Sequence, residues 1–324
     1  MKVSAFGSCL AKRMENFVAL RRLAETDYQS QTRLLVYFDR FLAKEHFNEP
    51  CLTREIVQRY LSSLSYLHPR TRYNRFSVVS QFCRYLCRFE PLCYVPEAIR
   101  SAKPETSRIP YIFTKTQIQD LLAKAAKLQP QHSLRPHTYR TLFGLLYTTG
   151  LRVGEALALD IKDFYPEPMR LYIREGKFRK SRWVPLALST CEILQKYIDK
   201  RQNTMPPAED DPLFISLRHS RLHHRTVYKT FCALLKQCQI HKGKAHGPRI
   251  HDLRHSFAVH RLLEWYGDGQ DINARLPALA TYMGHVGVAS TQIYIQATPE
   301  LYQQAHQRFL TYVRSNNITN GGLS

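Results

Sequence analysis

The sequence predicts a mainly helical protein with a small antiparallel β-sheet, divided into two domains. Apolar residues recur at helical spacing through most of the chain, for example from Ile56 to Leu64. The stretch from 170 to 188 instead alternates apolar and polar residues around a polar turn, which is typical of a small hairpin. A polar stretch with two prolines, from 100 to 113, interrupts the helical pattern as linkers between domains do.

The first expected domain covers residues 1–104 and consists of short helices. Helical spacing is clear from about residue 30, and Thr53 offers an N-cap for the helix that follows it. A basic amphipathic helix then opens with Pro69, and no acidic residue balances its arginines before Glu90. We therefore expect this helix to contact phosphates, through Arg70, Arg72, Arg75 and Arg84.

The second expected domain covers residues 105–324 and combines helices with the hairpin. A helix capped near Thr114 or Thr116 opens it, and a strongly apolar helix ends at Gly150, which permits a tight stop. The hairpin follows. Helical patterns then return over residues 191–202, 225–238 and 254–266.

The charge balance indicates a polyanionic partner. Lys and Arg total 47 against 26 Asp and Glu in 324 residues, so the net charge is +21. Both halves of the chain are basic, which favours a clamp around the ligand over a basic tail. We find no run of roughly 20 apolar residues that could span a bilayer. The eight cysteines include no C-x-x-C pair, and no apolar signal-type segment precedes them, so we expect reduced thiols and a cytoplasmic protein.

Two groups of residues raise the question of a metal. Cys83 and Cys87 lie one helical turn apart among aromatic residues, with Cys93 nearby, and this pattern favours core packing over a zinc site. His251 and His255 have the spacing of half a zinc site, but no third ligand follows at a suitable distance and Arg254 would repel a dication. We therefore expect no metal and no cofactor.

Basic residues that could hold a phosphate occur in separate stretches of the second domain. In "TTGLRVGEALALD", Arg152 follows the helix stop at once and Glu155 lies one turn further on. A guanidinium there can contact two phosphate oxygens together, which a lysine cannot. In "EGKFRKSRWVPL", Lys177 lies at the hairpin tip, where a flexible ammonium can reach a substrate, while Lys180 and Arg182 are expected to grip backbone phosphates.

Two more stretches supply proton-carrying side chains. "IHDLRHSFAVH" places His251 and Arg254 on one face of a helix's first turn, and a histidine can exchange a proton near neutral pH. In "YMGHVGVASTQIYIQATPE", Gly284 lets the backbone turn before His285, and Tyr294 follows nine residues later between two isoleucines. Paired carboxylates of a two-metal nuclease and a glycine-rich nucleotide loop are both missing from the sequence.

In this order, TGLRVGE, GKFRKSRWVPL, HDLRH and GHVGVASTQIY closely resemble the motifs of the tyrosine recombinase (phage integrase) family, which includes Xer-like and mobile-element recombinases. The resemblance covers about residues 108–300. It implies a helical core-binding domain and an α+β catalytic domain that close as a C-shaped clamp around duplex DNA.

The resemblance also implies a role for each matching position. Arg152 and Arg254 would bind the non-bridging oxygens of the scissile phosphate, with Glu155 as a supporting carboxylate. Lys177 would be the general acid for the departing 5′ oxygen, and His251 would handle the tyrosine proton. His285 would hydrogen-bond the phosphate, and Tyr294 would be the nucleophile.

These roles imply two transesterifications through a 3′-phosphotyrosyl link, without metal, ATP or cofactor. The expected function is the integration, excision or transposition of a mobile element by a homo-tetramer on specific, synapsed DNA sites, with accessory proteins possible. Two alternatives are a nicking-closing enzyme like the type IB topoisomerases and a non-catalytic architectural DNA-binding protein.

One segment departs from the family pattern. The chain between Arg254 and His285 is several residues longer than the common form and contains a Gly267-Asp268-Gly269 turn and Pro277. The apolar residues that follow still predict a helix leading into Gly284. The amphipathic C-terminal stretch is expected to pack on a neighbouring protomer, or else on its own domain.

Overall fold

The structure is a computed structural model that describes residues 6–23, 28–97, 110–174, 181–204, 211–240 and 247–284. The chain folds as two compact units, Met1–Arg108 and Ile109–Ser324. Each unit has a hydrophobic core of its own. The mainly helical fold with one small antiparallel sheet is confirmed. The functions assigned to domains 1–104 and 105–324 stay predictions.

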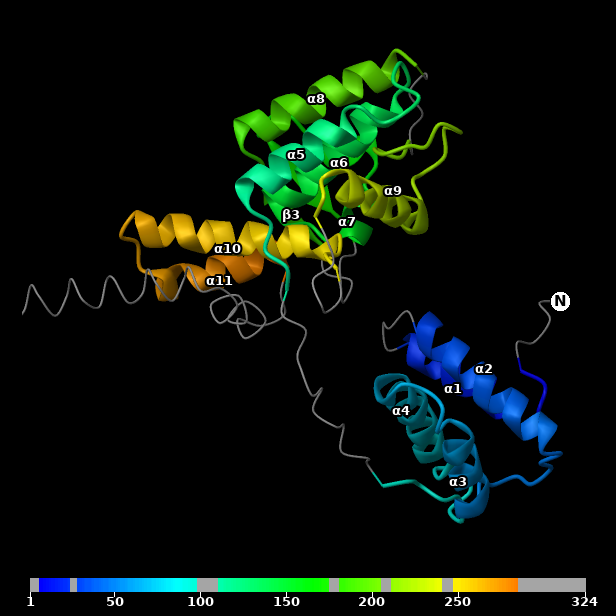
Figure 1. Ribbon diagram of the computed structural model, residues 1–324. Coiled ribbons are helices and arrows are strands. Elements are labelled where there is room, and N and C mark those ends of the chain that lie inside the picture. Colours follow the sequence, from blue (N-terminus) through cyan, green and yellow to red (C-terminus); the bar gives the residue numbers. More distant parts are fainter. Residues whose placement is uncertain are drawn as a thin grey trace, which may run out of the picture. The chain divides into compact units, whose positions relative to one another are not determined.

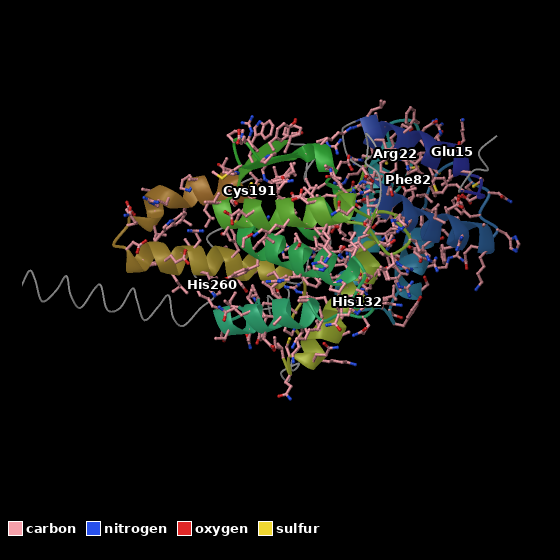
Figure 2. All side chains as sticks on the ribbon, turned by 90° about the horizontal axis from the view of Figure 1, so that it is seen from above. Glu15, Arg22, Phe82, His132, Cys191 and His260 are labelled. Atoms are coloured by element: carbon pink, nitrogen blue, oxygen red, sulfur yellow. The ribbon has the colours of Figure 1, made fainter. Side chains whose placement is uncertain are left out.

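The N-terminal unit contains four described helices, α1 (Ala11–Leu23), α2 (Gln29–Lys44), α3 (Arg54–Ser63) and α4 (Pro69–Leu86) (Figure 1). The N-cap prediction at Thr53 is confirmed, because its hydroxyl accepts a hydrogen bond from the Ile56 amide at 3.4 Å. Figure 2 labels Phe82 on α4, and this ring packs 5.5 Å from the ring of Phe17 on α1. Helix α1 itself was not predicted, because its apolar residues do not mark one face: Leu20 and Leu23 are exposed.

Helix α4 is the basic amphipathic helix that the sequence predicts. Its buried side carries Phe76, Val79 and Phe82, while Arg70, Arg72 and Arg84 are exposed. Arg75 is half-buried and lies over the ring of Tyr37, 4.2 Å from its centroid. Contact between this helix and a phosphate backbone stays a prediction.

The C-terminal unit surrounds α6 with other helices. Its described elements are α5 (Lys115–Ala125), α6 (Arg135–Thr149), α7 (Val153–Ala158), a 3-10 turn (Ile161–Asp163), β1 (Phe164–Tyr165), β2 (Arg170–Ile173), β3 (Arg182–Pro185), α8 (Leu188–Gln202), α9 (His224–Gln237), α10 (His251–Gly267) and α11 (Ile272–Met283). Helix α6 is buried on several sides, because its apolar residues do not lie on one face only, and α5, α8 and α9 lie around it (Figure 1). Of the two predicted capping positions, Thr114 is the N-cap of α5, and it forms a complete capping box.

The strand register decides which side chains of the hairpin point inward. The sheet is antiparallel in the order β1-β2-β3, with Ile173 opposite Arg182 and Tyr172 opposite Trp183. Successive side chains of a strand point to opposite faces, and directly opposed residues share a face. Arg182 therefore lies on the buried face with Ile173 and Val184, whereas Trp183 lies on the exposed face. The turn at the hairpin tip, residues 175–180, lies outside the described residues.

Two glycines end helices in the left-handed conformation, where a side chain would be strained. Gly150 ends α6 with φ +62° and Gly284 ends α11 with φ +69°. A Cβ atom added to Gly150 would lie 2.4 Å from the ring of Phe257 on α10. The turn between α6 and α7 can therefore approach α10 this closely because residue 150 has no side chain.

The long segment between Arg254 and His285 forms a helical hairpin. Helix α10 ends at Gly267, the chain turns through Asp268 and Gly269, and α11 folds back along α10 (Figure 1). Pro277 lies inside α11 without ending it. The buried face of α11 supplies Leu276, Leu279 and Met283 to a core shared with α10, so the predicted apolar helix leading into Gly284 is confirmed.

Substituting Gly150 by alanine should destabilise the protein. The left-handed conformation and the clash with Phe257 together should lower the free energy of unfolding by roughly 2–4 kcal/mol. Chemical unfolding measures the effect. Gly154→Ala is the matched control, because Gly154 is exposed in α7 and a Cβ there meets nothing described within 4 Å, so this variant should be neutral or up to about 1 kcal/mol more stable. Equal effects of the two substitutions would contradict the interpretation.

Candidate active site

Arg152 lies at the turn between α6 and α7 and is held on two sides. It is the N-cap residue of α7, and its side chain is 22% exposed. One guanidinium nitrogen, Nη1, donates to Glu155 Oε1 at 2.7 Å, and Nη2 donates to the carbonyl of Gly284 at 2.9 Å. The helix start therefore directs Arg152 toward the end of α11, and part of its side chain still reaches the surface.

Glu155 is a buried carboxylate between two arginines. Its oxygens accept from the side chain and backbone amide of Arg152, and from both terminal nitrogens of Arg182 at 3.1 and 2.9 Å. Burial alone would raise the pKa of Glu155, but the hydrogen bonds and charge of Arg182, reinforced by those of Arg152, lower this pKa to about 2. Glu155 is therefore ionised at neutral pH and fixes both guanidinium groups.

Arg254 joins the same place from the first turn of α10. Arg254 is only 1% exposed to solvent. Its guanidinium donates through Nη1 to the carbonyl of Gly150 and through Nη2 to the carbonyl of Met283 at 2.8 Å. Arg152 and Arg254 thus hold the two consecutive carbonyls at the C-terminal end of α11, directly before His285.

His251 faces this group of cations as a neutral ring. It begins α10, and its ring lies 4.7 Å from the ring of His255 in an edge-on contact. His251 is an exposed residue, but the surrounding protein removes part of the water around its ring, and this loss of water, followed by the charges of Arg254 and Arg249, lowers its pKa to about 4. His251 is therefore uncharged at neutral pH and able to accept a proton.

Asp252 anchors the start of α10 through hydrogen bonds to Arg249. It is fully buried, and its carboxylate accepts from the backbone amide of Arg249 at 2.7 Å and from the Arg249 side chain at 3.1 Å. Burial and the neighbouring His251 lower the pKa of His255 to about 4 as well. In the part of the chain that the structure describes, no three His, Cys, Asp or Glu side chains are grouped so that they could hold a metal ion.

The structure brings four of the predicted site residues together and leaves others outside its description. Hydrogen bonds connect Arg152, Glu155 and Arg254 at the carboxyl end of α11, and His251 lies close enough to Arg254 and Arg152 for their charges to lower its pKa. Lys177, Lys180, His285 and Tyr294 lie outside the described residues. None of the helices in the described ranges is long and apolar enough to cross a membrane.

Arg182 has a place that the sequence reasoning did not foresee. We expected it on a DNA phosphate, but its guanidinium donates to Glu155 and to the carbonyl of Tyr282 at 3.1 Å. The cause is the register, which puts Arg182 on the buried face of the sheet with Val184. In "RWVPL", Arg182 lies two residues before the apolar Val184, so both side chains belong to the same face of the strand. This spacing is the sequence signal that could have revealed the buried position of Arg182.

The geometry gives the site a definite chemical capacity. Guanidinium groups from two distant segments converge, and a buried carboxylate holds one of them, so an anion bound here would be neutralised by side chains. The neutral imidazole of His251 supplies a proton acceptor beside them. This combination suits attack on a phosphodiester.

Comparison with known proteins agrees with this capacity. Residues 112–300 match the model of the phage integrase family. The chain is 36% identical over 307 residues to the "Putative integrase/recombinase y4rB" of Sinorhizobium fredii, covering 93% of this chain and 97% of that protein. It is 32% identical over 246 residues to the tyrosine recombinase XerC of Shewanella amazonensis, covering 75% of this chain and 76% of that protein.

Solved structures share the fold at lower sequence identity. The Tn1549 transposon integrase in complex with transposon right end DNA matches with a TM-score of 0.65 at 15% identity, over 95% of this chain and all of that one. The XerH recombinase in a post-cleavage complex with its difH substrate matches with a TM-score of 0.62 at 22% identity, over 85% of this chain and 77% of that one. The family model matches more than half of the chain, and two relatives share more than 30% identity over most of it. This chain therefore belongs to the phage integrase family and is a tyrosine-type site-specific recombinase.

Proposed function

We propose that this recombinase cuts and rejoins double-stranded DNA at specific sites through a 3′-phosphotyrosyl link to Tyr294. The observation that carries the proposal is the meeting of Arg152 and Arg254 at the last carbonyls of α11, immediately before His285. The sequence then reaches Tyr294 nine residues after His285. A phosphate bound by the two arginines would thus lie at the start of the segment that carries the nucleophile.

Each residue then has one role in the transesterification. Arg152 and Arg254 bind the non-bridging oxygens, and Glu155 holds Arg152 in place. Tyr294 attacks the phosphorus, and His251 takes the phenolic proton. Lys177 donates a proton to the departing 5′ oxygen, while His285 hydrogen-bonds the phosphate. A phenol has a pKa of about 10, so its attack needs both a proton acceptor and a neutralised phosphate.

The chemistry needs no external energy. The bond energy of the cleaved phosphodiester is kept in the phosphotyrosine, and a 5′ hydroxyl of the partner DNA reverses the step. Side chains neutralise the developing charge, and this electrostatic stabilisation should be the largest catalytic contribution. We infer no need for ATP, a cofactor or a metal ion.

The proposed substrate is duplex DNA at the ends of a mobile element, brought together by four protomers in the bacterial cytoplasm. The net charge of +21 supports a long DNA contact. The exposed arginines of α4, Arg70, Arg72 and Arg84, are proposed to contact backbone phosphates together with Arg75 and Lys180. The solved relatives above, which hold DNA, support the same partner.

Trapping of the covalent link tests the proposal. Nicked duplexes that tile the DNA flanking the gene are incubated with the protein in EDTA, so that the cleaved piece diffuses away and the adduct remains. The wild-type protein should form an adduct at a 3′ end and release a 5′ hydroxyl, whereas Tyr294→Phe should form none. Gel retardation should show equal DNA binding by both proteins. A wild-type protein that binds a duplex specifically but forms no adduct would refute the proposed chemistry, as would an adduct formed by Tyr294→Phe.

The rate of cleavage should change little between pH 7.5 and pH 6. Because the pKa of His251 in the free protein is lowered to about 4, the ring stays neutral and able to accept a proton over this range. With the usual pKa of about 6.5, the neutral fraction and the rate would fall roughly fourfold. The measurement is the initial rate of adduct formation at limiting protein, with DNA occupancy determined at each pH. His251→Gln serves as the control for pH effects from other groups, and a fourfold fall in the wild type that this variant lacks would contradict the prediction.

A further inference from the structure

Arg182 connects three parts of the site from its place at the start of β3. Its two terminal nitrogens donate to the two oxygens of Glu155, and Nε donates to the carbonyl of Tyr282. Its side chain is 14% exposed, so these bonds are sheltered from water. One guanidinium therefore ties the sheet to α7 and to the last turn of α11.

The close approach to α11 depends on Gly284. A Cβ atom on residue 284 would lie 2.8 Å from Cζ and from Nη1 of Arg182. The planar guanidinium thus lies directly against the backbone of Gly284, whose carbonyl accepts from Arg152. Arg182 and Arg152 together hold the last turn of α11 as far as Gly284.

The charges show why a second arginine is useful here. Arg152 and Glu155 alone would form a neutral pair, and a phosphate would have to compete with the carboxylate for the guanidinium. Arg182 binds both carboxylate oxygens, so the group of Arg152, Glu155 and Arg182 carries a net charge of +1. Without Arg182, Glu155 would lose one of its two cationic partners while still buried, which is costly.

We propose that Arg182 is a positioning residue for DNA cleavage: it holds Glu155 against Arg152 and fixes the end of α11, so that the site keeps its positive charge and geometry before the phosphate binds. The inference rests on the proposed function, because it assigns Arg182 a task in that same reaction. Arg182 acts through Glu155 and Gly284 and does not itself contact the reacting atoms.

Arg174 offers a matched control on the neighbouring strand, next to the cross-strand partner of Arg182, Ile173. It directly follows β2, and its guanidinium pairs with Asp160 and with Asp163 at 2.7 Å. These carboxylates lie beyond the C-terminal end of α7, away from Arg152 at its N-terminal end. Arg174 therefore anchors the same sheet by similar ion pairs, without a recorded contact to Glu155 or to α11.

The test measures single-turnover adduct formation at saturating protein, with the DNA trapped as above. Arg182→Met should slow cleavage roughly 10- to 100-fold, because a misplaced Arg152 stabilises the transition state poorly. DNA affinity should stay within about twofold, because the sheltered guanidinium of Arg182 is bonded to Glu155 and to the carbonyl of Tyr282. Arg182→Lys should slow cleavage about tenfold, because an ammonium keeps the charge but cannot span both carboxylate oxygens. Arg174→Met should stay within about threefold of the wild type.

A double-mutant cycle separates a role through Glu155 from a general loss of structure. If Arg182 acts in part through Glu155, the double variant Glu155→Gln with Arg182→Met should be slowed by clearly less than the product of the two single effects. The inference would be overturned if the rate reductions of the two single variants multiply in the double variant. It would also be overturned if Arg182→Met cleaved DNA at the wild-type rate. Thermal unfolding identifies any variant that fails to fold. If Arg182→Met does not fold, the cleavage rate of Arg182→Lys tests the inference in its place. Absence of adduct from the wild type would instead refute the proposed function, and the role of Arg182 with it.

Discussion

A buried carboxylate between two guanidinium groups is the interaction on which the geometry of this site depends. Glu155 is ionised because Arg182 and Arg152 surround it, and its pKa is lowered to about 2 although burial opposes ionisation. In return it fixes both arginines in sheltered positions. A charged site for an anion is thereby assembled before any DNA is present, which reduces the reorganisation that the reaction requires.

The carbonyl groups at helix ends hold the arginines of the site in place as well. Gly150 ends α6 and Gly284 ends α11, both in the left-handed conformation, and the carbonyls near these ends accept from Arg254 and Arg152. Carbonyls at a helix C-terminus lack partners within the helix and carry partial negative charge, so they suit guanidinium donors. The same contacts hold α6, α7, α10 and α11 in one arrangement.

Neutral histidines complement this cationic surrounding. Lowered pKa values leave both His251 and His255 uncharged near neutral pH, so the site gains a proton acceptor without adding a cation that would weaken the others. The fully buried Asp252 holds the helix start that carries them, through its bonds to Arg249. The electrostatics of the site thus depend on where water is excluded as much as on which residues are present.

The sequence by itself determined the fold class, most of the helices and the set of chemical groups. Helical periodicity, the caps at Thr53 and Thr114, and the glycine stops depend on neighbouring residues, so they can be predicted from local pattern. Helix α1 was not predicted, because its apolar residues do not form one face. Tertiary structure alone decided that Arg182 meets Glu155, that Arg254 is buried on the carbonyl of Met283, and that His251 is neutral. Such facts depend on strand register and on burial between segments up to 132 residues apart, as Arg152 and Gly284 are, and local pattern does not encode them.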